Sequence, residues 1–358
     1  MGELEFRDHR ADPDAWAREL GISREAVEVY LASDVLDLHL DTFIWNRVFG
    51  YDLRRRHERG LLGRHFYGQV DFPRILEAQI TGGTWVITTN PLRPRGGRPE
   101  TFVANLARLR KLFATVSDQF AVVKNVAEYR AARAAGKHGA FIGIQGGNAL
   151  DRELESLDLI ADDCVLRITL VHLSTSTLGV TSSPAAGRRK DEGLSDLGRD
   201  YVRRLNEKKI FLDLAHINRA GFFDALSVHD KSQPVLVTHT GVTGVHPHWR
   251  NLDDEQLRAV ADLGGTIGVM YQESFLGKPP CTTETVVDHV EHIVNTVGED
   301  HASLGSDWDG AISPPRDLTT CLDLPRVADR MLQRGWSPER VQKILGGNFL
   351  RTVEMLRG

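Results

Sequence analysis

The chain has very few cysteines, no long apolar run and no dominant charge. Its 358 residues include three cysteines, Cys164, Cys281 and Cys321, too few and too scattered for a disulfide framework or a zinc ribbon. No run approaches the roughly 18 apolar residues of a membrane span, and the acidic, polar start is unlike a signal peptide. We therefore expect a cytoplasmic protein that has no membrane partner.

A basic surface and the common catalytic motifs are missing as well. The 44 lysines and arginines are matched by 49 aspartates and glutamates, spread along the chain, whereas nucleic-acid binders show a basic stripe. There is no GxSxG elbow, no cysteine with a catalytic histidine signature and no GxxxxGK[ST] phosphate loop. These absences argue against nucleic acid as a partner and against serine, cysteine or P-loop chemistry.

The sequence does contain a repeated alternation of strands and helices. Eight short, β-branched apolar runs have the length of buried parallel strands. They lie at 35–39, 84–88, 140–145, 165–172, 210–216, 235–239, 266–271 and 302–307. Helical patterns lie at 102–116, 194–207, 252–263, 286–297 and 338–345. Eight such units predict an α/β fold, a single (β/α)₈ TIM barrel, with a doubly wound open sheet as the alternative.

Two further features complete the predicted organisation. Residues 1–33 have helical character, and we expect them to form an N-terminal helical extension outside a barrel that occupies 34–358. The long connections at 42–70, 173–193 and 311–322 are expected to lie over the carboxyl-terminal mouth of the barrel. Loops at that mouth select the substrate in barrels of this type.

The strand ends are rich in side chains that bind metals. In chain order they carry His39, Asp41, Gln145, His172, His216, His239 and Asp307. Imidazole and carboxylate together suit Zn²⁺ and its neighbours Mn²⁺, Co²⁺ and Fe²⁺. A single histidine at a strand end is usually a hydrogen-bonded structural residue, but several at the ends of one barrel predict a metal centre. Asp307, or a histidine that is not a ligand, would transfer protons.

The order of these motifs resembles the membrane (renal) dipeptidase family of zinc metallopeptidases, which are amidohydrolase-like barrels. The matching stretches are DLHLD at 37–41, IGIQGGNAL at 142–150, ITLVH at 168–172, DLAH at 213–216, VTH at 237–239, RNLDD at 250–254, GSDWDG at 305–310 and GGNFLR at 346–351. The resemblance extends from about residue 35 to the carboxyl terminus.

This resemblance implies roles for individual residues. One zinc ion would be held by His39 and Asp41, and a second by His216 and His239. The same family pattern implies that His172 polarises the substrate carbonyl, that Arg250 holds the substrate carboxylate, and that Asp307 acts as the proton-transferring carboxylate. An arginine suits a carboxylate because its guanidinium binds it through two parallel hydrogen bonds.

Two positions depart from the family pattern. Where the family has a glutamate that bridges both metals, followed three residues later by a histidine, this chain has Gln145 and Asn148. Two divalent ions about 3.5 Å apart repel by about 19 kcal/mol at an effective dielectric constant of about 20, and a neutral amide offsets less of this than a carboxylate. We therefore expect the two-metal site to be weakened or absent, with Gln145 and Asn148 available to the substrate.

Three arrangements follow from this expectation. One metal could be held by His39, Asp41, His216 and Asp307, with His239 free to polarise water. Both metals could bind weakly, with Gln145 as a carbonyl ligand. Hydrolysis could also be lost, leaving a pocket for binding or for another reaction.

By resemblance we expect a metal-dependent hydrolase that cleaves an amide bond in a small substrate with a free carboxylate. A dipeptide or an N-acyl amino acid fits this description. The same resemblance implies a homodimer. The alternatives are a diverged enzyme of specialised metabolism, with one metal or none and a non-peptide substrate, and a non-catalytic binding protein.

Overall fold

A parallel sheet forms the centre of the molecule. The computed structural model describes residues 4–57, 66–90 and 92–358, so part of the predicted connection at 42–70 lies outside the described residues. The strands are β1 (Leu36–Leu40), β2 (Gly82–Thr88), β3 (Phe120–Val122), β4 (His138–Gln145), β5 (Val165–Thr169), β6 (Phe211–Asp213), β7 (Leu236–Thr240), β8 (Thr266–Val269) and β9 (Ala302–Leu304). Each of the eight predicted runs overlaps one strand, and β3 is an additional one.

The sheet curls into a nearly closed barrel. Its strand order is β1-β2-β4-β5-β6-β7-β8-β9, all neighbours are parallel, and β3 pairs with β4 away from this path. The segment after β9 returns to β1, where Asp307 N donates to His39 O at 3.2 Å and Asp41 N donates to Trp308 O at 3.0 Å. The predicted TIM barrel is confirmed, and this contact between the first and last strands excludes the open sheet.

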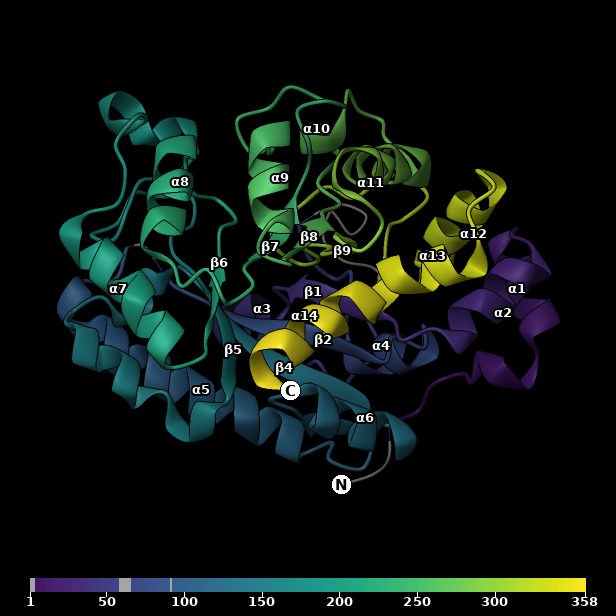
Figure 1. Ribbon diagram of the computed structural model, residues 1–358. Coiled ribbons are helices and arrows are strands. Elements are labelled where there is room, and N and C mark those ends of the chain that lie inside the picture. The colour runs from purple at the N-terminus through teal and green to yellow at the C-terminus, as the bar shows by residue number, and fades with distance from the viewer. Residues whose placement is uncertain (1–3, 58–65, 91) are drawn as a thin grey trace.

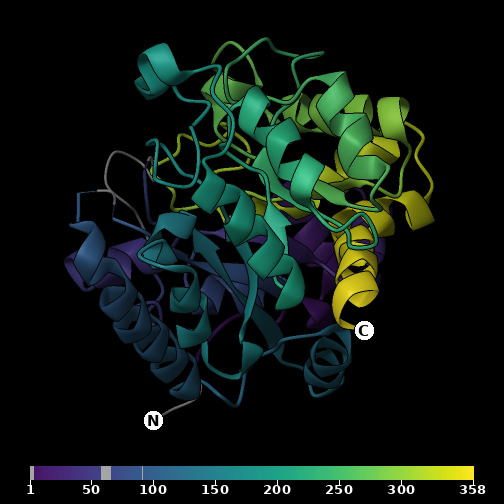
Figure 2. The ribbon, with the colours of Figure 1, turned by 60° about the vertical axis from the view of Figure 1, so that its left-hand side comes forward.

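Helices surround the barrel in both views of the molecule (Figures 1 and 2). They are α1 (Pro13–Leu20), α2 (Arg24–Ala32), α3 (Phe43–Phe49), α4 (Phe72–Glu77), α5 (Arg98–Ala114), α6 (Val126–Ala134), α7 (Asp196–Glu207), α8 (Arg219–Val228), α9 (Asp254–Ala261), α10 (Glu273–Leu276), α11 (Thr283–Val297), α12 (Pro325–Gln333), α13 (Pro338–Gln342) and α14 (Asn348–Arg357). Within the described residues, no helix is long and apolar enough to cross a membrane.

Local signals account for the predicted helices. In α9, Asp253 accepts a hydrogen bond from Gln256 N and the Gln256 side chain accepts one from Asp253 N, which is a capping box. Ser195 likewise caps the start of α7 by accepting from Gly198 N. All five predicted helical segments contain helix, although 338–345 ends in a π-helical turn, η9 (Lys343–Gly347). Helices such as α8, whose apolar residues do not form a clear stripe, were not predicted.

The amino-terminal helices α1 and α2 pack on the outside of the barrel. In Figure 1 these purple helices lie beside the yellow α12 and α13, and contacts join α2 to both. The backbone N and the hydroxyl of Ser23 both donate to Asp329 of α12, at 2.9 and 2.8 Å. Tyr30 is completely buried, and its hydroxyl donates to Ala78 O at 2.8 Å. The division into an extension at 1–33 and a barrel at 34–358 stays a prediction, but these contacts are extensive.

If the extension stabilises the barrel, removing the Tyr30 ring should destabilise the whole protein. We expect Tyr30→Ala to lower the free energy of unfolding by about 3–5 kcal/mol, because it empties a buried aromatic site. Tyr30→Phe removes only the hydrogen bond and should cost about 1 kcal/mol. Urea denaturation measures both, and Leu92→Ala, at a side chain that is 90% exposed, is the control. A loss for Tyr30→Ala no larger than the control's would show that the extension folds independently.

Candidate metal centre

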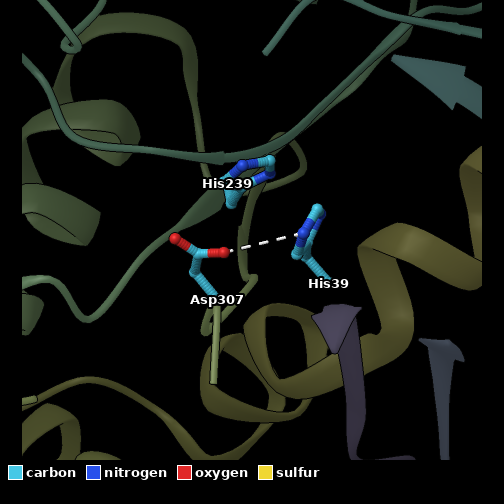
Figure 3. Close-up of side chains that lie close together, drawn as sticks. All are labelled: His39, His239 and Asp307. Atoms are coloured by element: carbon cyan, nitrogen blue, oxygen red, sulfur yellow. Dashed lines mark ion pairs between the residues drawn. The ribbon is translucent and has the colours of Figure 1, made fainter. Parts of the chain in front are cut away.

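Three buried side chains from three strand ends converge at the mouth of the barrel (Figure 3). His39 lies in β1, His239 lies in β7, and Asp307 follows β9. One ligand atom from each lies within 4.8 Å of the others, and the three residues are 0, 0 and 7% exposed. Among the described residues this is the group that could hold a metal ion.

Carboxylates surround the ring of His39. Its Nε2 atom lies 3.5 Å from Asp41 Oδ2 and 3.6 Å from Asp307 Oδ1, and it is buried without a hydrogen-bond partner among the described residues. Below it, Asp37 accepts hydrogen bonds from His39 N at 2.9 Å and Ser306 N at 3.0 Å. Asp37 therefore aligns the two strand ends that carry His39 and Asp307.

The remaining strand-end histidines join the same cluster. His216 Nε2 lies 2.7 Å from His239 Nε2, so two ring nitrogens point at one another. The ring centres of His172 and His216 are 4.8 Å apart, and those of His39 and His239 are 3.7 Å apart. Burial lowers the pKa of all four rings, that of His172 to about 4. The rings are therefore neutral at pH 7, and neutral imidazole is the form that binds metals.

Two residues of the cluster have unusual backbone conformations. His216 has a φ of 65° and Asp307 a φ of 62°, in the left-handed region that few residues other than glycine adopt, although asparagine, aspartate and histidine do so more often than the rest. Each such residue costs of the order of 1 kcal/mol and is kept only where the surroundings impose it. The strain turns both side chains inward just after their strands end.

The two carboxyl groups of the cluster influence one another. Burial, and then the negative charge of Asp41, raises the pKa of Asp307 well above its ordinary value. Burial opposes ionisation of Asp41, but the nearby His39 ring and the hydrogen bond from the Thr88 hydroxyl outweigh it, so the pKa of Asp41 is lowered. A divalent cation between the carboxyl groups would let both ionise. Buried carboxylates and neutral imidazoles together fit such a cation.

Arg250 lies on one side of the cluster. It is 3% exposed, and its Nη2 donates to His239 O at 2.6 Å. Burial lowers its pKa to about 10, although the charges of Asp307 and Asp213 act in the opposite direction. Its Nε has no hydrogen-bond partner among the described residues, and a cavity of about 190 Å³ lies between it and His216. This geometry suits a guanidinium that receives a carboxylate.

A larger cavity of about 530 Å³ lies on another side of the cluster. His172 and Thr88 line it, and the Thr88 hydroxyl donates a short hydrogen bond to Asp41. Helix α3 contributes Arg47, and α5 forms another wall. The predicted connection at 42–70 therefore begins at the mouth, as expected, and the cluster borders two cavities.

Comparison with known proteins identifies the family. The model described as "Membrane dipeptidase (Peptidase family M19)" matches residues 23–357. The chain belongs to the membrane dipeptidase family. The predicted resemblance is confirmed, and the chain is a hydrolase of the metallo-dipeptidase type. A purely binding function is not favoured.

Individual relatives agree with this assignment. Dipeptidase tcpJ of Claviceps purpurea (strain 20.1) is 29% identical over 298 residues, which cover 80% of this chain and 69% of that protein. The structure of a metallopeptidase from Rhodobacter sphaeroides, liganded with a phosphinate mimic of L-Ala-D-Ala, is 25% identical, with a TM-score of 0.80, and the match covers 90% of this chain and 99% of that one. A structure described as dipeptidase AC is 26% identical, with a TM-score of 0.78, covering 91 and 99%.

The two residues that depart from the dipeptidase pattern lie in different surroundings. Gln145 ends β4 beside Thr88 of β2, it is 1% exposed, and its Oε1 is buried without a hydrogen-bond partner among the described residues. Asn148 lies in the 3₁₀ helix η4 (Gly147–Leu150). With the amide oriented so that both of its groups are satisfied, its nitrogen donates to Gly146 O and its oxygen accepts from Arg98 Nη1, both at 3.1 Å. Gln145 is thus positioned near the strand ends, whereas Asn148 contacts an arginine of the larger cavity.

Arg167, a fully buried arginine within β5, was not predicted as a site residue from the sequence. Its Nη1 lies 3.1 Å from Asp213 Oδ2 and its Nη2 donates to His39 Nδ1 at 2.8 Å. Space for it comes from Gly143, where a Cβ atom would lie 2.8 Å from Arg167 Nε. A charged residue inside the apolar run at 165–172 was the available signal.

The contact between Arg167 and His39 affects the metal centre. A guanidinium only donates hydrogen bonds, so His39 Nδ1 must accept, and the neutral ring then carries its proton on Nε2. Binding of a cation to Nε2 has to displace this proton. Arg167 and Asp213 neutralise one another, so this buried pair does not supply negative charge that would offset a second cation.

The Arg167–Asp213 pair provides a stability test. Arg167→Met leaves Asp213 buried without its counter-ion, and we expect the free energy of unfolding to fall by about 3–5 kcal/mol. Adding Asp213→Asn should restore part of this loss, because no uncompensated charge remains. Urea denaturation measures both variants. Arg203→Met, which breaks an exposed pair with Asp200, is the control and should stay near the wild type; equal losses at the two arginines would contradict the interpretation.

Proposed function

We propose that the chain catalyses metal-assisted hydrolysis of the amide bond in a dipeptide or an N-acyl amino acid that has a free carboxylate. The observation that supports this most directly is the buried group of His39, His239 and Asp307 at the barrel mouth. Asp41 and His216 adjoin it and complete a donor set of imidazoles and carboxylates. Zn²⁺ is the proposed ion, with Mn²⁺, Co²⁺ or Fe²⁺ as alternatives.

Each residue around this group has a proposed task. A divalent cation supplies Lewis-acid polarisation of a carbonyl and makes water more acidic. Arg250 binds the substrate carboxylate, and neutral His172 lies where it can donate a hydrogen bond to the scissile carbonyl oxygen. Asp307, at the edge of the same group, accepts a proton from water and passes it to the leaving amine.

We infer that the centre holds one tightly bound cation. Gln145 lacks the negative charge that a bridging carboxylate would bring, and the charge of Asp213 beneath His39 is already neutralised by Arg167. A homodimer and a cytoplasmic location, both expected from the sequence, remain predictions that gel filtration and cell fractionation test.

Metal analysis tests the number of cations. Protein purified without chelators should contain about one divalent ion per chain, and removal of that ion by a chelator should abolish dipeptide hydrolysis. His239→Ala should lose the ion, whereas His229→Ala, at a buried histidine bonded to Gln233 O outside the cluster, should keep it. Two tightly bound ions in the wild-type protein would overturn the single-cation inference.

Substitution of Gln145 tests whether the absence of a carboxylate at the end of β4 weakens binding of a second metal ion. Gln145→Glu restores a carboxylate at the end of β4, and we expect the affinity for a second ion to rise by about tenfold or more, with a parallel increase in dipeptidase activity. Gln145→Leu removes the amide without adding charge and should show neither gain. Titration with Zn²⁺ and with Mn²⁺, followed by kinetic assays, measures both effects. An unchanged second-ion affinity in Gln145→Glu would mean that Gln145 does not weaken the site.

A further inference from the structure

The larger cavity beside the cluster is lined by an unusual set of charges. Four arginines contribute to its wall: Arg47, Arg93, Arg98 and Arg108. No aspartate or glutamate among the described residues lines it. The arginines come from α3, from the connection after β2 and from α5, so the fold collects them from separate segments.

Among the four arginines of the larger cavity, Arg47 is affected by the charge of Asp41, a residue of the metal cluster. It is half-buried, its Nη2 donates to Thr88 O at 2.8 Å, and its buried Nε has no hydrogen-bond partner among the described residues. Burial lowers its pKa, Asp41 opposes this shift and Arg108 adds to it. Arg47 therefore has an N–H group that can still donate a hydrogen bond, and its charge is repelled by that of Arg108.

Two nearby arginines that do not line the cavity form ion pairs with carboxylates. Arg95 lies 3.5 Å from Asp151, and Arg110 of α5 lies 3.2 Å from Asp162. Arg47 and Arg108 form no ion pair with a described carboxylate, and the Nη2 of Arg108 donates only to Asn46 O, at 2.6 Å. The fold thus supplies counter-ions to arginines around the cavity and leaves these two for another anion.

The position of the cavity determines which part of a substrate enters it. Arg250 and its smaller cavity lie beside His216, whereas the larger cavity lies beside His172 and Thr88. The rings of His172 and His216 are in contact between them. A substrate whose carboxylate is held by Arg250 and whose scissile bond lies at the cluster therefore extends its acyl half into the arginine-lined cavity.

We propose that this cavity binds a second carboxylate, carried by the acyl half of the substrate. The preferred substrates then have an acidic side chain, or an equivalent carboxylate, on the residue before the scissile bond. This inference rests on the proposed amide hydrolysis. Guanidinium groups bind carboxylates through paired, charge-assisted hydrogen bonds. A neutral ligand group would displace water from the cavity without compensating the positive charges of the arginines, which would then repel one another.

Kinetics with matched dipeptides test the charge preference. Glu-Ala and Gln-Ala differ only in the charged group, and we expect kcat/KM for Glu-Ala to be higher by about tenfold or more. Arg108 is exposed, and Arg108→Gln should reduce the ratio of kcat/KM for Glu-Ala to kcat/KM for Gln-Ala, mainly by raising KM for Glu-Ala. The double variant Arg47→Gln/Arg108→Gln should bring this ratio near one. Arg110→Gln, on the same helix outside the cavity, is the matched control and should keep the ratio. Equal rates for the two dipeptides in the wild type would overturn the proposal.

A binding measurement separates this proposal from the proposed reaction. Calorimetry with glutarate should detect binding to the wild-type protein, and Arg47→Gln/Arg108→Gln should weaken it by about tenfold or more. If that loss occurs although neither dipeptide is cleaved, the hydrolytic function fails while the carboxylate site stands. Glutarate affinity that the double variant leaves unchanged, or binding of inorganic phosphate without binding of glutarate, would overturn the carboxylate site.

Discussion

The guanidinium of Arg167 holds the interior of the barrel together just below the metal cluster. It pairs with Asp213 of β6 and donates to Thr169 of β5, to Ile144 O of β4 and to His39 of β1. A buried charge is tolerated only when it is paired and hydrogen-bonded, and this network satisfies that condition. The ring of His39, and with it the shape of the centre, depends on this one side chain.

Charge balance connects the two unusual features of the protein. The residue at the end of β4 is neutral Gln145, and a permanent cation lies beneath the cluster in Arg167. Neutral Gln145 brings no negative charge to the metal site, and the charge of Asp213 is taken up by Arg167. On the outer side, the arginine-lined cavity adds further positive charge where substrate enters. The site as a whole is therefore suited to fewer cations and to a more anionic substrate.

Much of the site was predictable because of how a barrel is built. Parallel strands bring their carboxyl ends to one mouth, so His39, His172, His216 and His239 could be assigned to one cluster from their positions after apolar runs. The chain order of the motifs also identified the family. Arg167 was missed because its partners Asp213 and His39 are distant in sequence, so the charge inside the apolar run at 165–172 did not by itself indicate what it contacts. Strand β3 was missed since it lies outside the regular alternation.

The sequence by itself determined the eight strands, the barrel and the set of side chains at its mouth, because these depend on local periodicity and on the order of elements. Only the tertiary structure decided which side chains converge. It placed Asp307 beside His39 and Asn148 beside Arg98, and it aligned His216 with His239. It also assembled the arginine-lined cavity from three separate segments. Distances between side chains from different strands and helices arise from packing, which no local pattern encodes.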